Sequence, residues 1–260
     1  MSLDQPVSFV KHQTLTRDAF LGGRLTVSQP RNGFRAGLDS VLLGASLRPG
    51  SRCVLDLGAG VGTAALVALT HNDQASATLV ERDDAVAAIA RENIAANGMA
   101  ERAHAITLDV TAKGADRAAA GLHADHYESV IANPPYFDSA SGTLAAAERS
   151  GARHMSAQTL DLWVRTAATS AAPEGEVIFI YPAAGLPALL SAFSQRFGAV
   201  TVLPLVSRAG DAASRVLVRA IKGSRAPLTL LASRVLHEDA SRAFTPQFEA
   251  VFRGNARLNW

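Results

Sequence analysis

Residues 133 to 136 read NPPY, and they follow the strand-like run YESVIA directly. Proline has no backbone N–H and cannot continue a central strand, so the strand has to end at Asn133. Because a residue before a proline is held in extended conformations, the carbonyl groups of Asn133 and Pro134 point in nearly fixed directions. The side-chain oxygen of Asn133 and the carbonyl of Pro134 can then accept both hydrogens of one planar amine, while the ring of Tyr136 can stack on a base. We therefore take Asn133, Pro134, Pro135 and Tyr136 as candidate catalytic residues, although a pair of prolines can also simply end a strand.

A glycine-rich turn, DLGAGVG, follows the first strongly apolar strand-like run. Gly58 and Gly60 permit a tight turn at the positive N-terminal end of the next helix, where a ligand can approach the backbone. The third glycine of the dinucleotide-binding pattern is absent, because position 63 is Thr, so there is less reason to expect a pyrophosphate. Asp56 would repel a phosphate, but its carboxylate suits a ligand that carries an ammonium group.

Two further acidic residues end the next strand-like runs. Glu81 follows SATLV about twenty residues after the glycines, where a carboxylate typically accepts both hydroxyls of a ribose. Asp109 ends HAITLD, where a carboxylate can accept a hydrogen bond from an adenine amino group. An ammonium group, a ribose and an adenine together describe S-adenosylmethionine as the cofactor. The predicted cofactor residues are Asp56, Gly58, Gly60, Glu81 and Asp109, with Asn133 at the neighbouring strand end; each charge could instead be a solvated strand-end group.

The net charge of +2 is distributed unevenly along the 260 residues. Residues 1–36 hold five Lys and Arg against two Asp and Glu, residues 201–260 hold nine against four, and the middle is acidic. Basic flanks around an acidic centre could bind phosphates and present one nucleotide to the middle, unless these arginines are ordinary solvated charges.

Composition indicates a globular protein that does not depend on a disulfide or a metal ion. At 48% hydrophobic residues the chain can bury a core. The single Cys53 lies inside the apolar run CVLDL, and the seven histidines are scattered, so we expect no metal site. No stretch is apolar for long enough to cross a bilayer, and we expect a soluble, cytoplasmic protein without membrane contact.

Strand-like and helix-like stretches alternate from about residue 53, which predicts an α/β fold with a Rossmann-like, mostly parallel sheet. The runs at 199–206 and 214–222 have no helix between them, so they should form an antiparallel pair that places an antiparallel strand at one edge. A small hairpin is expected near residues 20–30. We divide the chain into an N-terminal hairpin and helix extension (1–50) packed on the core, a cofactor-binding catalytic domain (51–225) and a basic C-terminal extension of the same domain (226–260).

DLGAGVG, the acidic residue of LVERD, LDV and NPPY together resemble the motifs of class I S-adenosylmethionine-dependent methyltransferases. NPPY resembles the amino-methylating subgroup, whose members act on adenine in DNA and RNA, on guanine in ribosomal RNA and on a glutamine amide in release factors. The segments 18–47, 148–154 and 215–223 are similar to those of bacterial tRNA adenine-N6 methyltransferases that modify the adenosine 3′ of the anticodon in valine tRNA. Met155 departs from that family, in which an acidic residue is expected after ARH.

This resemblance implies methyl transfer from S-adenosylmethionine to the N6 amine of an adenine in tRNA. It places Asp39 beside the cofactor, although Asp39 fits an ordinary helix cap about as well. Arg35, Arg149, Arg153 and His154 become candidate RNA contacts, with solvated surface charges as the alternative. The oligomeric state stays open.

Other functions remain compatible with these residues. The same amino-methylation could act on ribosomal RNA, DNA or a protein glutamine, because NPPY does not name the substrate. A non-catalytic RNA-binding module could keep the fold, and a nicotinamide-dependent oxidoreductase could use a similar sheet, although it would leave NPPY unexplained.

Overall fold

A computed structural model describes residues 14–31, 35–135, 156–238 and 241–260. Its centre is one nine-stranded sheet in the order β10-β8-β9-β7-β6-β3-β4-β5, with β11 also paired to β8. The strands are β3 (Cys53–Leu57), β4 (Ser76–Glu81), β5 (Ala103–Thr107), β6 (Tyr127–Ala132), β7 (Ala171–Pro182), β8 (Phe197–Val206), β9 (Arg215–Lys222), β10 (Thr229–Leu230) and β11 (Arg234–Val235).

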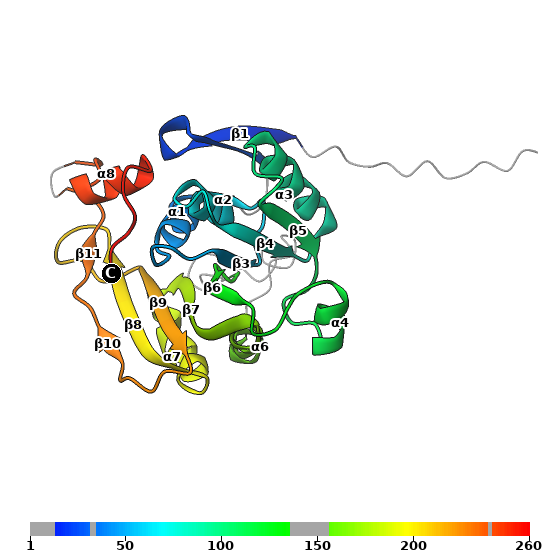
Figure 1. The fold of residues 1–260 in the computed structure, drawn as a ribbon. Helices are drawn as coiled ribbons and strands as arrows, with labels where there is room; N and C mark the ends of the chain where they lie inside the picture. The colour runs from blue at the N-terminus through cyan, green and yellow to red at the C-terminus, as the bar shows by residue number, and fades with distance from the viewer. Residues whose placement is uncertain (1–13, 32–34, 136–155, 239–240) are drawn as a thin grey trace, which may run out of the picture.

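The strands β3 to β7 pair in parallel, whereas β9 runs antiparallel to both β7 and β8. The mostly parallel sheet and the antiparallel β8–β9 pair confirm the fold predicted from the sequence. The pair is not the outermost part of the sheet, because β10 and β11 add parallel to β8 beyond it. Figure 1 shows this orange segment along the outer side of β8. Strands of two residues are too short for a sequence pattern to reveal them.

Helices cover both faces of the sheet (Figure 1). On one face lie α1 (Leu38–Ala45), α2 (Thr63–Thr70), α3 (Asp84–Ala96) and α8 (Pro246–Phe252), and on the other α4 (Gly114–Ala119), α6 (Ala157–Ser170) and α7 (Leu186–Ser194). Successive residues of a strand point to opposite faces, so Ile131 joins one apolar core while Val130 and Ala132 join the other. Two short 3₁₀ turns, η1 (Leu21–Gly23) and η2 (Ala183–Gly185), complete the described elements.

The predicted N-terminal hairpin consists of β1 (Leu15–Phe20) and β2 (Leu25–Pro30). Asn97, directly after α3, accepts from the backbone N of Thr26 at 3.0 Å and donates to its carbonyl at 2.8 Å. Asn93 of α3 makes the same pair of bonds to Ser28 at 2.7 and 2.9 Å. Each side-chain amide therefore pairs with the backbone N–H and C=O of one residue at the free edge of β2, as a neighbouring strand would. These bonds hold the hairpin on the core, as expected, while the domain boundaries themselves stay a prediction.

The two ends of the described chain also meet. The guanidinium of Arg24, beside η1, donates to the backbone carbonyl of Gly254, which follows α8 and lies 230 positions away. α8 in turn packs against α1, with Phe248 and Val251 fully buried. The segments 14–31 and 241–260 thus form one cover over the same face of the sheet.

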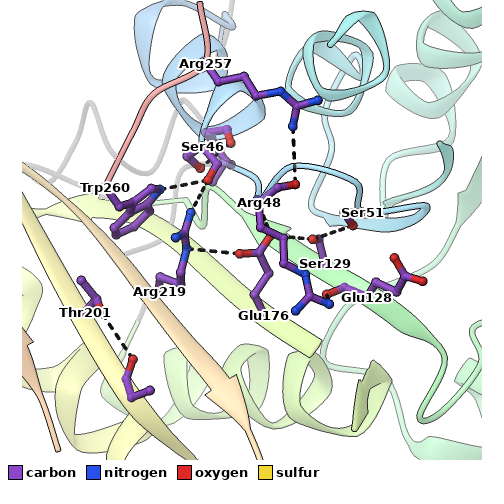
Figure 2. Close-up of polar contacts among 12 residues, drawn as sticks. Ser46, Arg48, Ser51, Glu128, Ser129, Glu176, Thr201, Arg219, Arg257 and Trp260 are labelled. Atoms are coloured by element: carbon purple, nitrogen blue, oxygen red, sulfur yellow. Dashed lines mark hydrogen bonds and ion pairs between the residues drawn. The ribbon is translucent and has the colours of Figure 1, made fainter. Parts of the chain in front are cut away.

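A buried ionic cluster lies in the sheet on the side away from the strand carboxyl ends (Figure 2). Glu176 of β7 is 1% exposed, and its Oε1 accepts from Ser129 Oγ at 2.6 Å and from the backbone N of Arg48 at 2.9 Å. Its Oε2 lies 3.2 Å from Nε of Arg219, an ion pair without the angle of a hydrogen bond. The Arg219 guanidinium lies 4.1 Å from the ring centre of Trp260. The cluster joins β6, β7 and β9 to the chain end and to the connection between α1 and β3.

Candidate active site

The strand order reverses between β3 and β6, because the chain moves outward from β3 to β5 and then returns to the other side of β3. Ligands of open α/β sheets bind at such a point, outside the strand carboxyl ends. The register pairs Leu57 with Ala132, so Gly58 and Asn133 leave their strands next to each other. The structure therefore brings the glycine turn and NPP to one place, as two neighbouring strand ends.

The glycine turn has left-handed backbone at Gly58 and Gly60, with φ values of +70° and +56°. A Cβ atom on Gly58 would lie 2.3 Å from Cη2 of Trp163, a buried residue of α6. A Cβ atom on Gly60 would meet nothing within 4 Å among the described residues. Gly58 is thus required by packing beneath the turn, whereas Gly60 lies on the open side, where a ligand can approach the backbone.

We expect Gly58→Ala to destabilise the protein by about 2–4 kcal/mol, because it adds overpacking against Trp163 to the cost of a left-handed alanine. Gly121→Ala is the matched control, since Gly121 has a φ of +85° but no atom within 4 Å of its Cβ position, and it should cost only about 1 kcal/mol. Denaturant unfolding measures both. Equal losses in the two variants would contradict the contact with Trp163.

Glu81 holds the glycine turn in place. Its Oε2 accepts from the backbone N of Gly60 at 3.0 Å, and its Oε1 accepts from the backbone N of Asp83 at 3.0 Å. This places the carboxylate directly beside the turn, at the end of β4. Its predicted contact with a ribose stays a prediction.

Asp109 lies exposed just after β5, at the same edge of the sheet. Its Oδ1 accepts from both the backbone N and the hydroxyl of Thr111, each at 2.7 Å. These bonds fix the turn that carries the carboxylate, and its contact with an adenine amine stays a prediction.

Asp56 lies underneath the glycine turn and is only 2% exposed. Its Oδ2 accepts from the backbone N of Ala65, in the first turn of α2, at 3.1 Å. Burial raises the pKa of Asp56 to about 7; the Ala65 hydrogen bond opposes this shift, and the nearby charge of Glu81 adds to it. Asp56 thus supports the glycine turn from below, and its predicted contact with an ammonium group stays a prediction.

The raised pKa predicts how stability depends on pH. Between pH 4 and 7 the folded protein keeps a proton on Asp56 that the unfolded chain, with a pKa of 3.8, releases, so stability falls as the pH rises through this window. Relative to Asp56→Asn, the wild-type free energy of unfolding should fall by about 4 kcal/mol from pH 4 to pH 8. Urea unfolding of both proteins across this range measures the difference. Parallel curves would show that the Asp56 carboxyl group is already ionised in the folded protein.

Asn133 comes directly after β6 with a half-buried side chain. Its Oδ1 is buried and has no hydrogen-bond partner among the described residues. A buried amide oxygen without a partner is costly, and such a group is common at functional sites. Pro134 is buried and Pro135 exposed, so the chain turns outward at the second proline.

The structure places Asp39 in the first turn of α1, where its Oδ2 accepts from Nε of Arg215 in β9 at 2.9 Å. The helix-cap alternative is wrong, because the N-cap residue is Gly37 and no side chain caps this helix end. Arg35 forms an ion pair with Asp18 and donates to Thr16 Oγ1 at 2.9 Å, which ties it to the N-terminal hairpin. Roles of these two residues in cofactor or RNA binding stay predictions.

Four predicted site residues lie outside the described part of the chain: Tyr136, Arg149, Arg153 and His154. Conversely, no pattern in the sequence indicates that Trp163 supports the glycine turn. It lies in a helix-like run whose apolar residues show only that one face is buried, and not which strand end that face meets.

Within residues 14–31, 35–135, 156–238 and 241–260, no group of three or more potential metal ligands is found. None of the helices in the described part is long and apolar enough to cross a membrane.

The proteins to which this chain is similar are named as methyltransferases. A tRNA1(Val) (adenine(37)-N6)-methyltransferase of Actinobacillus succinogenes is 29% identical over 91% of this chain and 96% of its own length. One of Aeromonas hydrophila subsp. hydrophila is 32% identical over 76% of this chain and 80% of its own length. The crystal structure of a predicted O-methyltransferase from Agrobacterium tumefaciens is 30% identical, with a TM-score of 0.73 over 85% of this chain and 98% of that chain. A methyltransferase from Pyrococcus furiosus, 16% identical with a TM-score of 0.55 over 77% of this chain and 90% of that chain, shares the fold.

The family model of the methyltransferase small domain matches residues 37–179, which include the glycine turn, Glu81, Asp109 and Asn133. This match extends over more than half of the 260 residues. The chain therefore belongs to the methyltransferase small domain family.

Proposed function

We propose that this protein transfers a methyl group from S-adenosylmethionine to the N6 amine of an adenine in tRNA, at the position 3′ of the anticodon. The family supports methyl transfer, and the names of the relatives from Actinobacillus succinogenes and Aeromonas hydrophila support the substrate. The observation that carries the proposal is the buried Asn133 Oδ1 without a described partner, next to the glycine turn.

The residues around the glycine turn fit this cofactor. Gly60 leaves open space over the backbone, and Asp56 would stabilise the positive charge of the ligand from beneath the turn when it is ionised. Glu81 ends β4 and Asp109 follows β5, and they would take the ribose and the adenine. When bound, S-adenosylmethionine supplies a methyl group on a positively charged sulfur, which a nitrogen lone pair can attack.

Asn133 and Pro134 would prepare the acceptor amine. The lone pair of an exocyclic adenine amine is delocalised into the ring, so the amine is a poor nucleophile. Asn133 Oδ1 and the Pro134 carbonyl would accept the two amine hydrogens, which draws the nitrogen toward tetrahedral geometry and directs its lone pair out of the ring plane. Asn133 Oδ1 and the Pro134 carbonyl would act only as hydrogen-bond acceptors, and the proton that the nitrogen loses after methylation would leave to solvent. Positioning therefore does most of the work.

The base has to be unpaired to reach this corner. A stacked and paired adenine does not expose its amine to an enzyme pocket, whereas a nucleotide of a single-stranded loop can turn outward. The ring of Tyr136 would stack on that base, which is worth about 1–3 kcal/mol. This role is inferred from the sequence, since Tyr136 lies outside the described residues.

The test is methyl transfer to defined RNA. An unmodified transcript of valine tRNA is incubated with the enzyme and labelled S-adenosylmethionine, and the nucleosides are then identified. We expect N6-methyladenosine in this transcript and none in a control transcript with guanosine in place of adenosine 37.

Other products would point to other functions. A 2′-O-methylated nucleoside would favour oxygen methylation, and label only in ribosomal RNA, DNA or a protein glutamine would replace the tRNA substrate. Cofactor binding without transfer to any of these acceptors would favour a non-catalytic RNA-binding module.

A further inference from the structure

Charges at the carboxyl edge of the sheet differ between its two halves. The half that carries the cofactor residues, at the ends of β3, β4 and β5, is mainly acidic: Asp56, Glu81, Asp83, Asp84 and Asp109, with Arg82. The other half of this edge lies beyond Asn133, at the ends of β7, β8 and β11. Its charged residues among those that the structure describes are four arginines and three acidic residues: Arg208, Arg215, Arg234 and Arg242, with Asp39, Asp211 and Glu238. A polyanion is therefore repelled from the first half and attracted to the second.

Two exposed arginines are held together just beyond the end of β8. Arg208 follows β8, and its Nη2 donates to the backbone carbonyl of Ser241 at 3.3 Å, which brings the neighbouring Arg242 to the same place. The segment is braced at its base, because the backbone N of His237 donates to the carbonyl of Ser207 at 3.0 Å. Both guanidinium groups therefore stand on a supported turn rather than on a free chain.

Arg234 of β11 adds a third positive charge near the end of β8. It pairs in register with Leu205 near the end of β8, and its Nε is buried without a hydrogen-bond partner among the described residues. Because this Nε is shielded from solvent, the terminal nitrogens of the guanidinium are the donors that could meet a phosphate oxygen.

Among the residues that the structure describes, the acidic groups nearby offset this charge only in part. The Asp211 carboxylate accepts from the backbone N of Arg208 at 2.9 Å, which fixes it inside the turn, and Asp39 lies against Arg215. Glu238 is exposed. The three arginines Arg208, Arg234 and Arg242, which we call the β8 arginine cluster, are not in any ion pair found among the described residues.

We propose that the β8 arginine cluster binds the phosphate backbone of the tRNA on the side of Asn133 away from the cofactor. This inference rests on the proposed function, and it adds the surface on which the RNA lies. Three strand spacings separate β6 from β8, about 14 Å, so the cluster would meet phosphates a few nucleotides away from the base held at Asn133. Such contacts position the RNA without reading its sequence.

The experiment compares Arg208→Glu/Arg242→Glu with Arg225→Glu. Arg225 is exposed and follows β9, at the opposite edge of the sheet, so it controls for the loss of positive charge from the same part of the chain. Affinity for the valine tRNA transcript is measured over a series of salt concentrations. We expect the double variant to bind at least about tenfold more weakly, with a salt slope smaller by about two, and Arg225→Glu to bind like the wild type.

Three further readouts keep the result interpretable. The dissociation constant of S-adenosylmethionine should stay unchanged, KM for tRNA should rise, and kcat at saturating tRNA should stay within about twofold. Arg208→Gln/Arg242→Gln should show a smaller loss in the same direction. If both double variants bind tRNA as tightly as the wild type does, and the wild type methylates tRNA, the proposed RNA-binding surface is wrong and the proposed function stands. If the wild type neither binds nor methylates tRNA, the proposed surface and the proposed function are both wrong.

Discussion

Asn133→Ala is expected to lower methyl transfer to tRNA by at least about a hundredfold, while S-adenosylmethionine still binds within about tenfold of the wild-type affinity. The reason is that Asn133 Oδ1 is the buried acceptor next to the glycine turn, and removing one such aligned group typically costs a factor of about 10²–10³ in kcat. Single-turnover methyl transfer and equilibrium binding of the cofactor, measured on the same preparation, separate the two effects.

Asn255→Ala is the matched control for this prediction. Asn255 is an exposed asparagine after α8, and its replacement should leave both transfer and cofactor binding unchanged. Full activity of Asn133→Ala would remove Asn133 from the mechanism. Loss of cofactor binding in parallel with transfer would make Asn133 mainly a cofactor contact, which was also predicted from its place at the strand end.

Arg219→Ala is expected to destabilise the protein by about 3–5 kcal/mol. The replacement leaves the carboxylate of Glu176, which is 1% exposed, without its cationic partner in the sheet, and a buried charge that loses its partner is strongly destabilising. The contact with the Trp260 ring is lost as well. Urea unfolding at neutral pH, followed by circular dichroism, measures the change.

The control is Arg253→Ala, because Arg253 pairs with Glu249 on the surface of α8 and the two side chains are 63% and 42% exposed. Exposed pairs of this kind contribute about 0.3–0.5 kcal/mol. Replacing both Glu176 and Arg219 with methionine should be less harmful than Arg219→Ala alone, since no unpaired charge then remains. A loss below 1 kcal/mol in Arg219→Ala would show that water reaches Glu176.

The sequence predicted best those features that depend only on neighbouring residues, such as strand ends and turns. Prolines must end a strand, so the place of Asn133 after β6 followed from NPP, and the glycine turn followed from DLGAGVG. Parallel β-strands separated by helices gave the topology, and the topology alone brought Gly58 and Asn133 together.

Contacts between distant positions could not be predicted in this way. Nothing in the sequence pairs Asp39 with Arg215, 176 positions later, and the helix-cap interpretation of Asp39 failed because its local pattern was equally compatible with a first-turn position. Trp163 under Gly58 and the edge strands β10 and β11 were missed for the same reason, because side-chain packing and edge pairing depend on the whole fold.

The meeting of Arg24 with Gly254 has a consequence for the kinetics of folding. This contact closes a loop of 230 positions, whereas the parallel strand pairs of β3, β4 and β5 connect segments only about 25 positions apart. Loop-closure entropy makes contacts between distant positions late and slow to form. The sheet around the glycine turn should therefore assemble first, and the joint cover of segments 14–31 and 241–260 should close over it last, as a separate slow phase of refolding.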